Sequence, residues 1–334
     1  MPGARAARCE ALAGLQTGSA YACSPLHAPP SVWVEKNCYI DIWIEVLHAL
    51  KLDPLPVMPF TLAIDFEGDQ WTFFKPPHGE LYELYGLDVQ ELNVWRPLAE
   101  HALEHLAAGK LLSTEADAWW LPDTAGTDYH RQHTKTTIVL TEVDLDAEFA
   151  CYFHNGGFFR VEGDDFRQLF RLDMPSDAYA LPLFAETIRT DRLVRRPPSE
   201  LARLSLRYLA RHVSRRPATN PVRRFAERWS AELQVLQSRG LAHYHAWAFA
   251  TLRQLGAAFE LAARHLQWLG MHGEADLEPA VQAFDVIANG SKTLILKGAR
   301  SVMAGKPLDA DAMLRDMAAA WDRGMDFVAS RYSE

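Results

Sequence analysis

Residues 37–51 read NCYIDIWIEVLHALK, and this stretch decides the fold predicted for the first half of the chain. Its apolar residues recur at the three- and four-residue intervals of a helix with one buried face, and they are Ile40, Trp43, Ile44, Leu47 and Leu50. The pattern stops before Pro54, which cannot continue a helix. Cys38 therefore lies in the predicted first turn, where free backbone N–H groups and the helix dipole favour a thiolate.

The residues that follow this helix predict a mainly antiparallel sheet. Runs rich in β-branched and aromatic residues indicate strands at 71–75, 89–94, 111–121, 134–143, 148–153 and 158–161. A helical turn at 80–85 and an amphipathic helix at 98–108 interrupt them. The turn at 144–147 joins its flanking strands into a hairpin.

Beyond about Pro182 the sequence has only helical patterns. Ser199 is the predicted cap of one helix, and Asn220 with Pro221 opens another that ends at Gly240. Further helices are predicted at 241–269, 277–288, 291–304 and 309–330. We therefore expect a loosely ordered arm at 1–31, an α+β domain at 32–181 and an all-α helical bundle at 182–334.

Composition and charge restrict the class of protein. The 334 residues contain 43 acidic and 34 basic side chains, and this excess of acid argues against a general nucleic-acid binder. Four scattered cysteines do not make a disulfide framework, and no apolar run approaches the roughly 20 residues needed to cross a bilayer. With no signal for secretion, we expect a cytoplasmic protein that does not bind membranes.

Cys38 and two later residues predict nucleophilic chemistry. His133 directly precedes the strand 134–143, so its imidazole can serve as general base at the end of a sheet. A hairpin turn near 145–146 brings Asn155 within diagonal reach of His133, although a slip of one residue would substitute His154. Cys, His and Asn occur in this order in the papain-type arrangement, in which the amide orients the imidazole.

Two supporting predictions concern the oxyanion and metals. The Cys38 N–H and a side-chain donor, either Asn37 or Gln70, would stabilise a developing oxyanion. His130 and His133 have no third close ligand, so we expect no metal site, and no phosphate-binding glycine loop is present. The expected protein therefore has no bound cofactor.

Five segments resemble an uncharacterised bacterial family whose genes lie beside carrier proteins and the ligases that load amino acids onto them. The segments, which are parts of residues 33–172, are NCYIDIWIEVLHALKLDP, DFEGDQWTFFKPP, LYGLDVQELNVW, LPDTAGTDYHRQHTKTTI and YFHNGGFF. The leading cysteine helix and the later histidine strand are also distantly similar to the papain-like acyltransferases of the butirosin type. This resemblance implies a papain-like catalytic domain at 32–181.

The resemblance also implies a reaction. Butirosin-type enzymes move an aminoacyl group from the phosphopantetheine thioester of a carrier protein to an amine, with Cys38 matching their nucleophile and His133 their base. The third catalytic position differs from the pattern of these enzymes, because the related peptidases use Asp where this chain has His154 and Asn155. A hydrolase that uses water as the acceptor and a non-catalytic scaffold that binds the carrier protein or its ligase are the alternatives.

The distribution of charge suggests where the substrates would bind. Residues 61–170 hold twenty acids against seven basic residues, and an acidic mouth there would attract an ammonium group. Its candidate residues are Asp65, Glu67, Asp69, Glu115, Asp117 and Asp123. Residues 185–240 hold thirteen arginines against five acids, which predicts a docking surface for an acidic carrier protein with its phosphodiester arm. The first candidates are Arg215, Arg216, Arg223 and Arg224.

Overall fold

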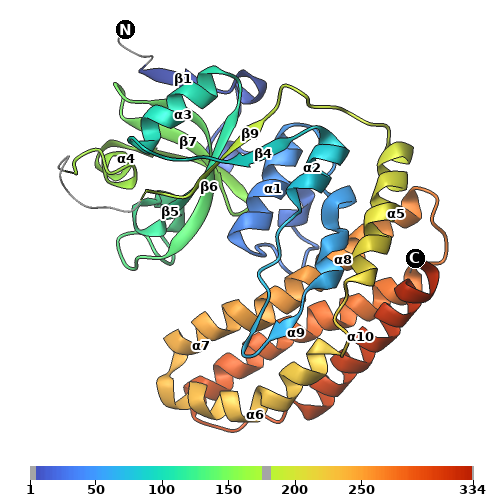
Figure 1. The fold of residues 1–334 in the computed structure, drawn as a ribbon. Helices are drawn as coiled ribbons and strands as arrows, with labels where there is room; N and C mark the ends of the chain where they lie inside the picture. The colour runs from blue at the N-terminus through green and yellow to red at the C-terminus, as the bar shows by residue number, and fades with distance from the viewer. Residues whose placement is uncertain (1–4, 175–181, 333–334) are drawn as a thin grey trace. The chain divides into compact units, whose positions relative to one another are not determined.

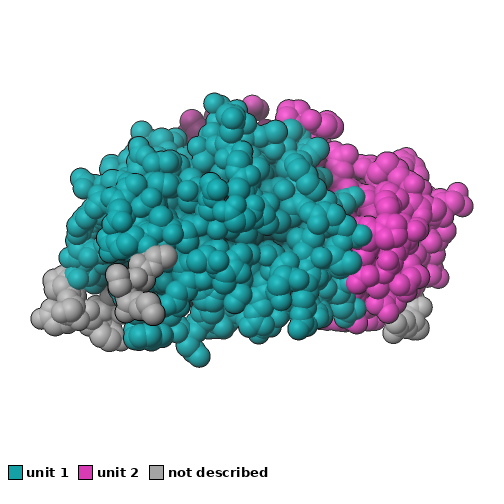
Figure 2. Space-filling view, turned by 90° about the horizontal axis from the view of Figure 1, so that it is seen from above, with its two compact units in different colours: residues 1–28, 37–53, 78–195 teal, residues 29–36, 54–77, 196–334 magenta. Residues whose placement is uncertain are grey.

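The computed structural model describes residues 5–174 and 182–332 and divides the chain into two compact units (Figures 1 and 2). The first unit comprises Met1–Ala28, Asn37–Asp53 and His78–Arg195, and the second comprises Pro29–Lys36, Pro54–Pro77 and Arg196–Glu334. The first unit holds the sheet and the second holds the long helices. The α+β class and the antiparallel sheet followed by helices are therefore confirmed.

Seven strands of the described residues form the sheet of the first unit, in the order β4-β9-β5-β6-β7-β8, with β1 also paired to β6. Their bounds are β1 Ala6–Arg8, β4 Asp88–Glu91, β5 Leu111–Asp117, β6 Lys135–Asp144, β7 Phe149–His154, β8 Gly157–Glu162 and β9 Ala185–Arg189. Neighbouring strands of this sheet pair antiparallel throughout the described residues. The long strand β6 is central, because it pairs along one edge with β5 and then β1 and along the other edge with β7.

The two faces of this sheet are covered by different helices. On one face lies α1 (Cys38–Ala49), which contacts β6 and β7 and whose Tyr39 bonds Glu186 of β9. On the other face lies α3 (Leu98–Ala107), whose His105 is 3.0 Å from the hydroxyl of Thr187. Glu186 and Thr187 are adjacent in β9, and alternation along a strand sends their side chains to opposite faces. The shorter helices of this unit are α2 (His78–Tyr85) and α4 (Gly163–Leu169).

The prediction of a loosely ordered arm at 1–31 is wrong for the described residues. Residues 6–8 add a strand to the sheet, and Cys9, Ser24 and His27 are buried. The arm lacks periodicity because it consists of one short strand, which pairs with β6, and single 3-10 turns, one of which is capped by Ser24, whose N–H donates to Glu45 of α1. The order of this segment therefore depends on tertiary packing, which no local sequence pattern indicates.

The predicted boundary between the domains also needs correction. Residue 181 lies outside the described residues, but β9 follows it and pairs with β4 and β5, so the sheet extends beyond Pro182. The second unit also contains two earlier segments, Pro29–Lys36 and Pro54–Pro77. The latter contains the 3-10 segment Leu55–Ala63 and the small hairpin of β2 (Phe66–Glu67) and β3 (Gln70–Trp71), where a single strand was predicted at 71–75.

The described part of the second unit has six α-helices, as many as the pattern predicts, but some of their bounds differ. They are α5 (Pro198–Ser214), α6 (Pro221–Arg239), α7 (Leu241–Ala248), α8 (Gln254–Met271), α9 (Glu278–Ala304) and α10 (Asp311–Tyr332). The predicted helix at 241–269 is interrupted by a π turn at 249–253, whereas the predicted break near Gly290 does not occur. A Cβ at Gly290 would overlap Met317, so this glycine permits close approach of α9 and α10. No helix in the described ranges has the length and apolar character of a membrane span.

The early segment Pro29–Lys36 is bonded to α8 and α9 within the second unit. The carboxylate of Glu260 accepts from the backbone N–H groups of Val32 and Trp33 at 2.6 and 2.9 Å. The buried indole of Trp33 donates to the Ala288 carbonyl at 3.1 Å and lies directly against Gly256. This glycine therefore makes room for the indole.

We predict that Gly256→Ala destabilises the protein by about 1–3 kcal/mol, because the added methyl group overlaps a buried indole ring that is itself held in place. Gly270→Ala in the same helix is the control, since a Cβ there meets no atom within 4 Å. That change is expected to be neutral or to stabilise by up to about 1 kcal/mol through helix propensity. Urea unfolding measures both variants, and equal stabilities would contradict the proposed packing.

Candidate active site around Cys38

Cys38 is the first residue of α1, and the cap of this helix leaves its own amide free. The Asn37 side chain accepts from the N–H groups of Tyr39 and Ile40 at 3.1 and 2.9 Å, and Asp41 donates to the Asn37 carbonyl at 3.0 Å. Among the described residues, the Cys38 N–H has no hydrogen-bond partner. The Cys38 N–H is therefore available to an incoming oxyanion. Asn37, which was predicted to donate to that oxyanion, instead caps the helix through its amide oxygen.

The four cysteines differ in their surroundings. All are free thiols. Burial raises the pKa of Cys9, of Cys23 and of Cys151, the last to about 11, which keeps these thiols protonated. Cys38 is half-buried, and its Sγ donates to Thr137 Oγ1 at 3.9 Å. Of the four, Cys38 alone begins an α-helix.

The strand register places several polar side chains on the sheet face that Cys38 contacts. Thr137 of β6 is directly opposite Glu115 of β5, and Ser113 of β5 is directly opposite Glu186 of β9. Directly paired residues and alternate residues along one strand share a face. Thr137, Glu115, Ser113 and Glu186 are therefore on one face, together with Asp117, the next alternate residue of β5. We call this the α1 face.

His133 is held at the end of this face by an acid and an aromatic ring. Its Nδ1 lies 2.6 Å from Asp117 Oδ2, and its ring stacks on Trp119 with centroids 4.4 Å apart. The other oxygen of Asp117 accepts from the Trp119 N–H at 3.0 Å, so one carboxylate fixes both rings. His133 remains 66% exposed, and Cys38 makes no hydrogen bond to it or to any other imidazole of the described residues.

The structure gives His133 a different partner from the predicted Asn155. Asn155 has φ +45° and lies in the tight turn between β7 and β8, and the carboxylate comes from β5 on the other side of β6. The predicted register already fails next to the turn, where Asp144 is opposite Phe149, and beyond the bulge between Leu140 and Glu142 Val139 is opposite Phe153. Asp117 was predicted as a substrate-binding acid and instead orients the histidine.

His154, the alternative to Asn155, belongs to a separate buried network. Its Nδ1 lies 2.6 Å from Asp123 Oδ2, its Nε2 lies 2.8 Å from Thr136 Oγ1, and Tyr152 also donates to Asp123. Thr136 and Thr137 are adjacent in β6, so this network lies on the face opposite Cys38. His154 is therefore not placed to serve Cys38.

The predicted acidic mouth is not a single surface. Asp123 is buried against His154 and Tyr152, Glu115 pairs with Lys135 at 3.2 Å, and Asp65 forms an ion pair with Arg224. The remaining candidates, Glu67 and Asp69, and the predicted oxyanion donor Gln70 are exposed residues of the β2–β3 hairpin in the second unit. Most of these acids thus already have partners within the protein.

The predicted docking arginines also differ in how free they are. Arg224 binds Asp65 and donates to the Phe66 carbonyl, so it holds the β2–β3 hairpin and is not a free docking residue. Arg223 pairs with Asp322 at 2.9 Å, Arg216 donates to the Val213 carbonyl, and Arg215 is exposed.

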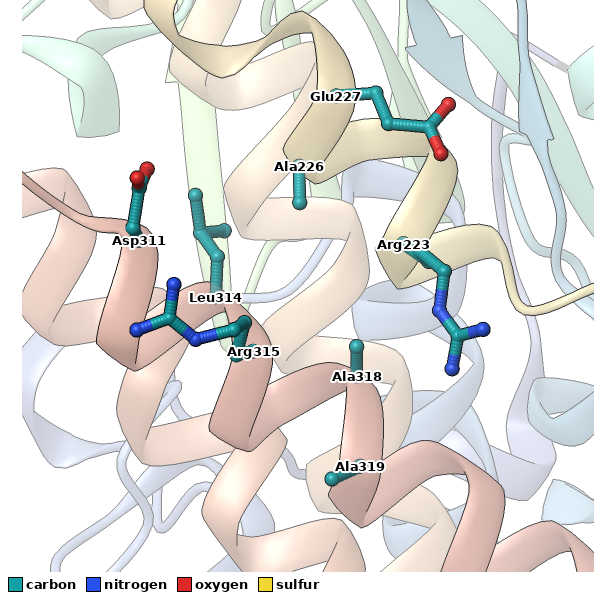
Figure 3. Close-up of a pocket in the computed structure, with 8 residues that line it drawn as sticks. All are labelled: Arg223, Ala226, Glu227, Asp311, Leu314, Arg315, Ala318 and Ala319. Carbon is teal, nitrogen blue, oxygen red and sulfur yellow. The ribbon is translucent and has the colours of Figure 1, made fainter.

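A groove of about 570 Å³ lies between α6 and α10 (Figure 3). Its lining is Arg223, Ala226, Glu227, Asp311, Leu314, Arg315, Ala318 and Ala319.

A second histidine on the α1 face has no counterpart in the sequence predictions. His78, the first residue of α2, lies 2.8 Å from the Tyr39 hydroxyl, which donates to Glu186 at 2.9 Å. The three residues are separated by 39 and 108 positions in the sequence, so no local motif joins them. Only the position of Tyr39 beside Cys38 could have drawn attention to them. In the described residues, no cluster of three or more possible metal ligands occurs.

A buried charge network fixes α1, and with it Cys38. The ring of His27 lies between Asp41 and Glu45, which are one turn apart on α1, with its Nε2 3.0 Å from Asp41 and its Nδ1 against Glu45. Both ring nitrogens face carboxylates, so both donate and the ring is an imidazolium. Glu45 also accepts from the Tyr21 hydroxyl at 2.7 Å and from the Ser24 N–H at 2.9 Å.

We predict that His27→Ala destabilises the protein by about 3–5 kcal/mol, because it removes the buried imidazole that lies between two buried carboxylates. His48→Ala is the matched control on α1, since His48 is near the surface and its hydrogen-bond partner is the Ala22 carbonyl at 3.2 Å, with no carboxylate involved. Its expected cost is below about 1 kcal/mol. Equal midpoints in urea unfolding would show that the network does not hold the helix.

Comparison with known proteins identifies the family. The DUF1839 N-terminal domain matches residues 22–190, and the DUF1839 C-terminal domain matches residues 198–330. The first match includes α1, His133 and the strands β4 to β9 of the sheet, and the second covers the helices α5 to α10. No curated protein matches the chain. The chain belongs to the DUF1839 family.

Proposed function

We propose that this protein is a cysteine-dependent acyltransferase with a papain-like catalytic unit. It would take an aminoacyl group from the phosphopantetheine thioester of a carrier protein, hold it as a thioester on Cys38 and pass it to an amine. One observation carries the proposal: Cys38 at a capped helix N-terminus and the Asp117 partner of His133 lie on the same face of the sheet. A thiol, an oriented imidazole and a free amide are the parts that acyl transfer requires.

The first half of the proposed reaction exchanges one thioester for another. His133 accepts the proton of Cys38, and Sγ attacks the carbonyl carbon of the donor. The bond from that carbon to the pantetheine sulfur breaks, and the imidazolium returns the proton to the departing thiolate. Exchange between two thiols is nearly isoenergetic and needs no oxidant. The Cys38 N–H would stabilise the transient oxyanion.

The second half forms the amide. The acceptor amine attacks the Cys38 thioester, the bond from carbon to Sγ breaks, and the proton lost by the amine passes through His133 to Cys38. Asp117 supports both halves, because a carboxylate on Nδ1 orients the ring and stabilises its protonated form. Apo sites often hold these groups farther apart than the reacting complex does, so substrate binding would bring His133 to Sγ.

We also propose that the arginine-rich helices recruit the carrier protein. Arg215, Arg216 and Arg223 are the remaining candidates, because Arg224 holds Asp65. Guanidinium groups bind phosphodiesters and carboxylates, which are the expected charges of the carrier. The ligase that loads the carrier is a further proposed partner.

We predict that wild-type protein incubated with aminoacyl-loaded carrier gains the mass of the aminoacyl group, because the Cys38 thiolate captures it. Intact-mass spectrometry measures this gain, and Cys38→Ala should abolish it while leaving carrier binding intact. Cys23→Ala, which removes another half-buried thiol, is the control and should retain the adduct. An adduct that survives Cys38→Ala would rule out the assigned nucleophile.

Adding acceptors to the same experiment separates the remaining functions. Loss of the adduct with formation of an amide supports transfer. Loss of the adduct as the free amino acid, without any dependence on amines, supports a hydrolase, and a carrier complex without an adduct supports a binding scaffold.

We predict that His133→Ala lowers the rate of Cys38 acylation by roughly 10²- to 10⁴-fold, since it removes the general base. His130→Ala is the matched control, because His130 lies on the same loop, is exposed and has its own carboxylate partner, Asp165, at 2.9 Å. The control should remain within about twofold of wild type. If both variants acylate at the wild-type rate in quench-flow measurements, His133 is not the base.

A further inference from the structure

Within the part of the chain that the structure describes, one buried carboxylate on the α1 face has no lysine or arginine partner. The Glu186 side chain is 7% exposed, and its Oε2 accepts from the Tyr39 hydroxyl at 2.9 Å. Its Oε1 is 3.6 Å from His78 Nε2, beyond hydrogen-bond range. Among the described residues, Oε1 accepts no hydrogen bond, although buried carboxylates are normally paired.

The neighbouring groups hold Glu186 in place and leave Oε1 open. The single proton of the Tyr39 hydroxyl goes to Glu186, so that oxygen accepts from His78, which must carry its proton on Nε2. Burial, reinforced by the charge of Glu186, raises the pKa of Tyr39 and keeps the hydroxyl protonated as a donor. His78 is the more exposed end of this chain, with 38% of its side chain accessible.

A second polar group beside Glu186 also has no partner. Ser113 is directly opposite Glu186 on the α1 face and is only 2% exposed, yet its Oγ makes no hydrogen bond within the described ranges. An orphaned buried hydroxyl costs free energy unless something binds it. A ligand with several N–H donors would satisfy both Ser113 Oγ and Glu186 Oε1.

Tyr39 connects Glu186 to the helix turn that carries the proposed nucleophile. Tyr39, which holds Glu186, is the residue after Cys38, and adjacent Cα atoms are about 3.8 Å apart. Glu115, the acid directly opposite Thr137, is already paired with Lys135. Glu186 is therefore the acid on this face that still needs a cation.

From this arrangement we propose that Glu186 and Ser113 bind the α-ammonium group of the acyl chain carried on Cys38, with His78 and Tyr39 as positioning residues. The inference rests on the proposed function and names its substrate class, α-aminoacyl groups in preference to uncharged acyl groups. An ammonium group offers three donors and one positive charge, which match the hydroxyl and the open carboxylate oxygen.

The test is a binding measurement that does not depend on turnover. Isothermal titration compares two stable probes, the glycyl and acetyl amides of aminopantetheine, with full-length Cys38→Ala protein. We expect the glycyl probe to bind at least about tenfold more tightly, and Glu186→Gln to remove that preference because the amide lacks the charge. Ser113→Ala should reduce the preference less, since it removes only a hydroxyl.

Glu115→Gln is the matched control and should keep the full preference, because Glu115 is already paired with Lys135. Glu186→Asp, which keeps the charge, should restore part of the preference, and thermal melting checks that each variant is folded. Equal binding of the two probes, no binding of either, or a preference that survives Glu186→Gln overturns the proposal. Failure of the Cys38 adduct assay with the preference intact would instead refute the acyltransferase reaction alone.

Discussion

The buried imidazolium of His27 between Asp41 and Glu45 is the interaction on which the first unit depends. Asp41 and Glu45 are one helical turn apart, so their carboxylates lie on the same side of α1, where His27 of the N-terminal segment contacts both. Tyr21, which bonds Glu45, also packs its ring against Phe153 and Phe158 of the sheet. The helix is thus tied to the sheet by charge, hydrogen bonds and aromatic packing together, and its first residue lies against β6.

Once α1 is fixed, strand alternation determines which chemistry can meet Cys38. Thr137 and Glu186 contact the first two residues of the helix, and Asp117 holds His133 farther along the same face. The network of His154 and Asp123 is equally well bonded, but it lies on the other face. Thr136 and Thr137 are adjacent in β6, and their side chains point to opposite faces. One contacts His154 and the other contacts Cys38.

Several sequence predictions failed where the deciding partner is distant. Asn155 was expected to orient the base His133, but the residue that contacts His133 is Asp117. Asp117 belongs to β5, which is not part of the β6–β7 hairpin from which the partner was predicted. Gly290 resembles a helix break in sequence, and only its contact with Met317 explains why α9 continues. Conversely, Asn220 and Pro221 begin α6 and Gly240 ends it as predicted, because caps act within one turn.

The sequence by itself determined the α+β class, the helix that begins at Cys38 and the change to helices in the second half, because periodicity and capping are local properties. It also singled out Cys38 and His133 as chemically suited residues. Only the tertiary structure decided that Asp117 orients His133, that Arg224 is committed to Asp65, and that Tyr39 donates to Glu186, directly opposite the unbonded hydroxyl of Ser113. Register, bulges and long-range ion pairs depend on segments that meet only in the folded chain.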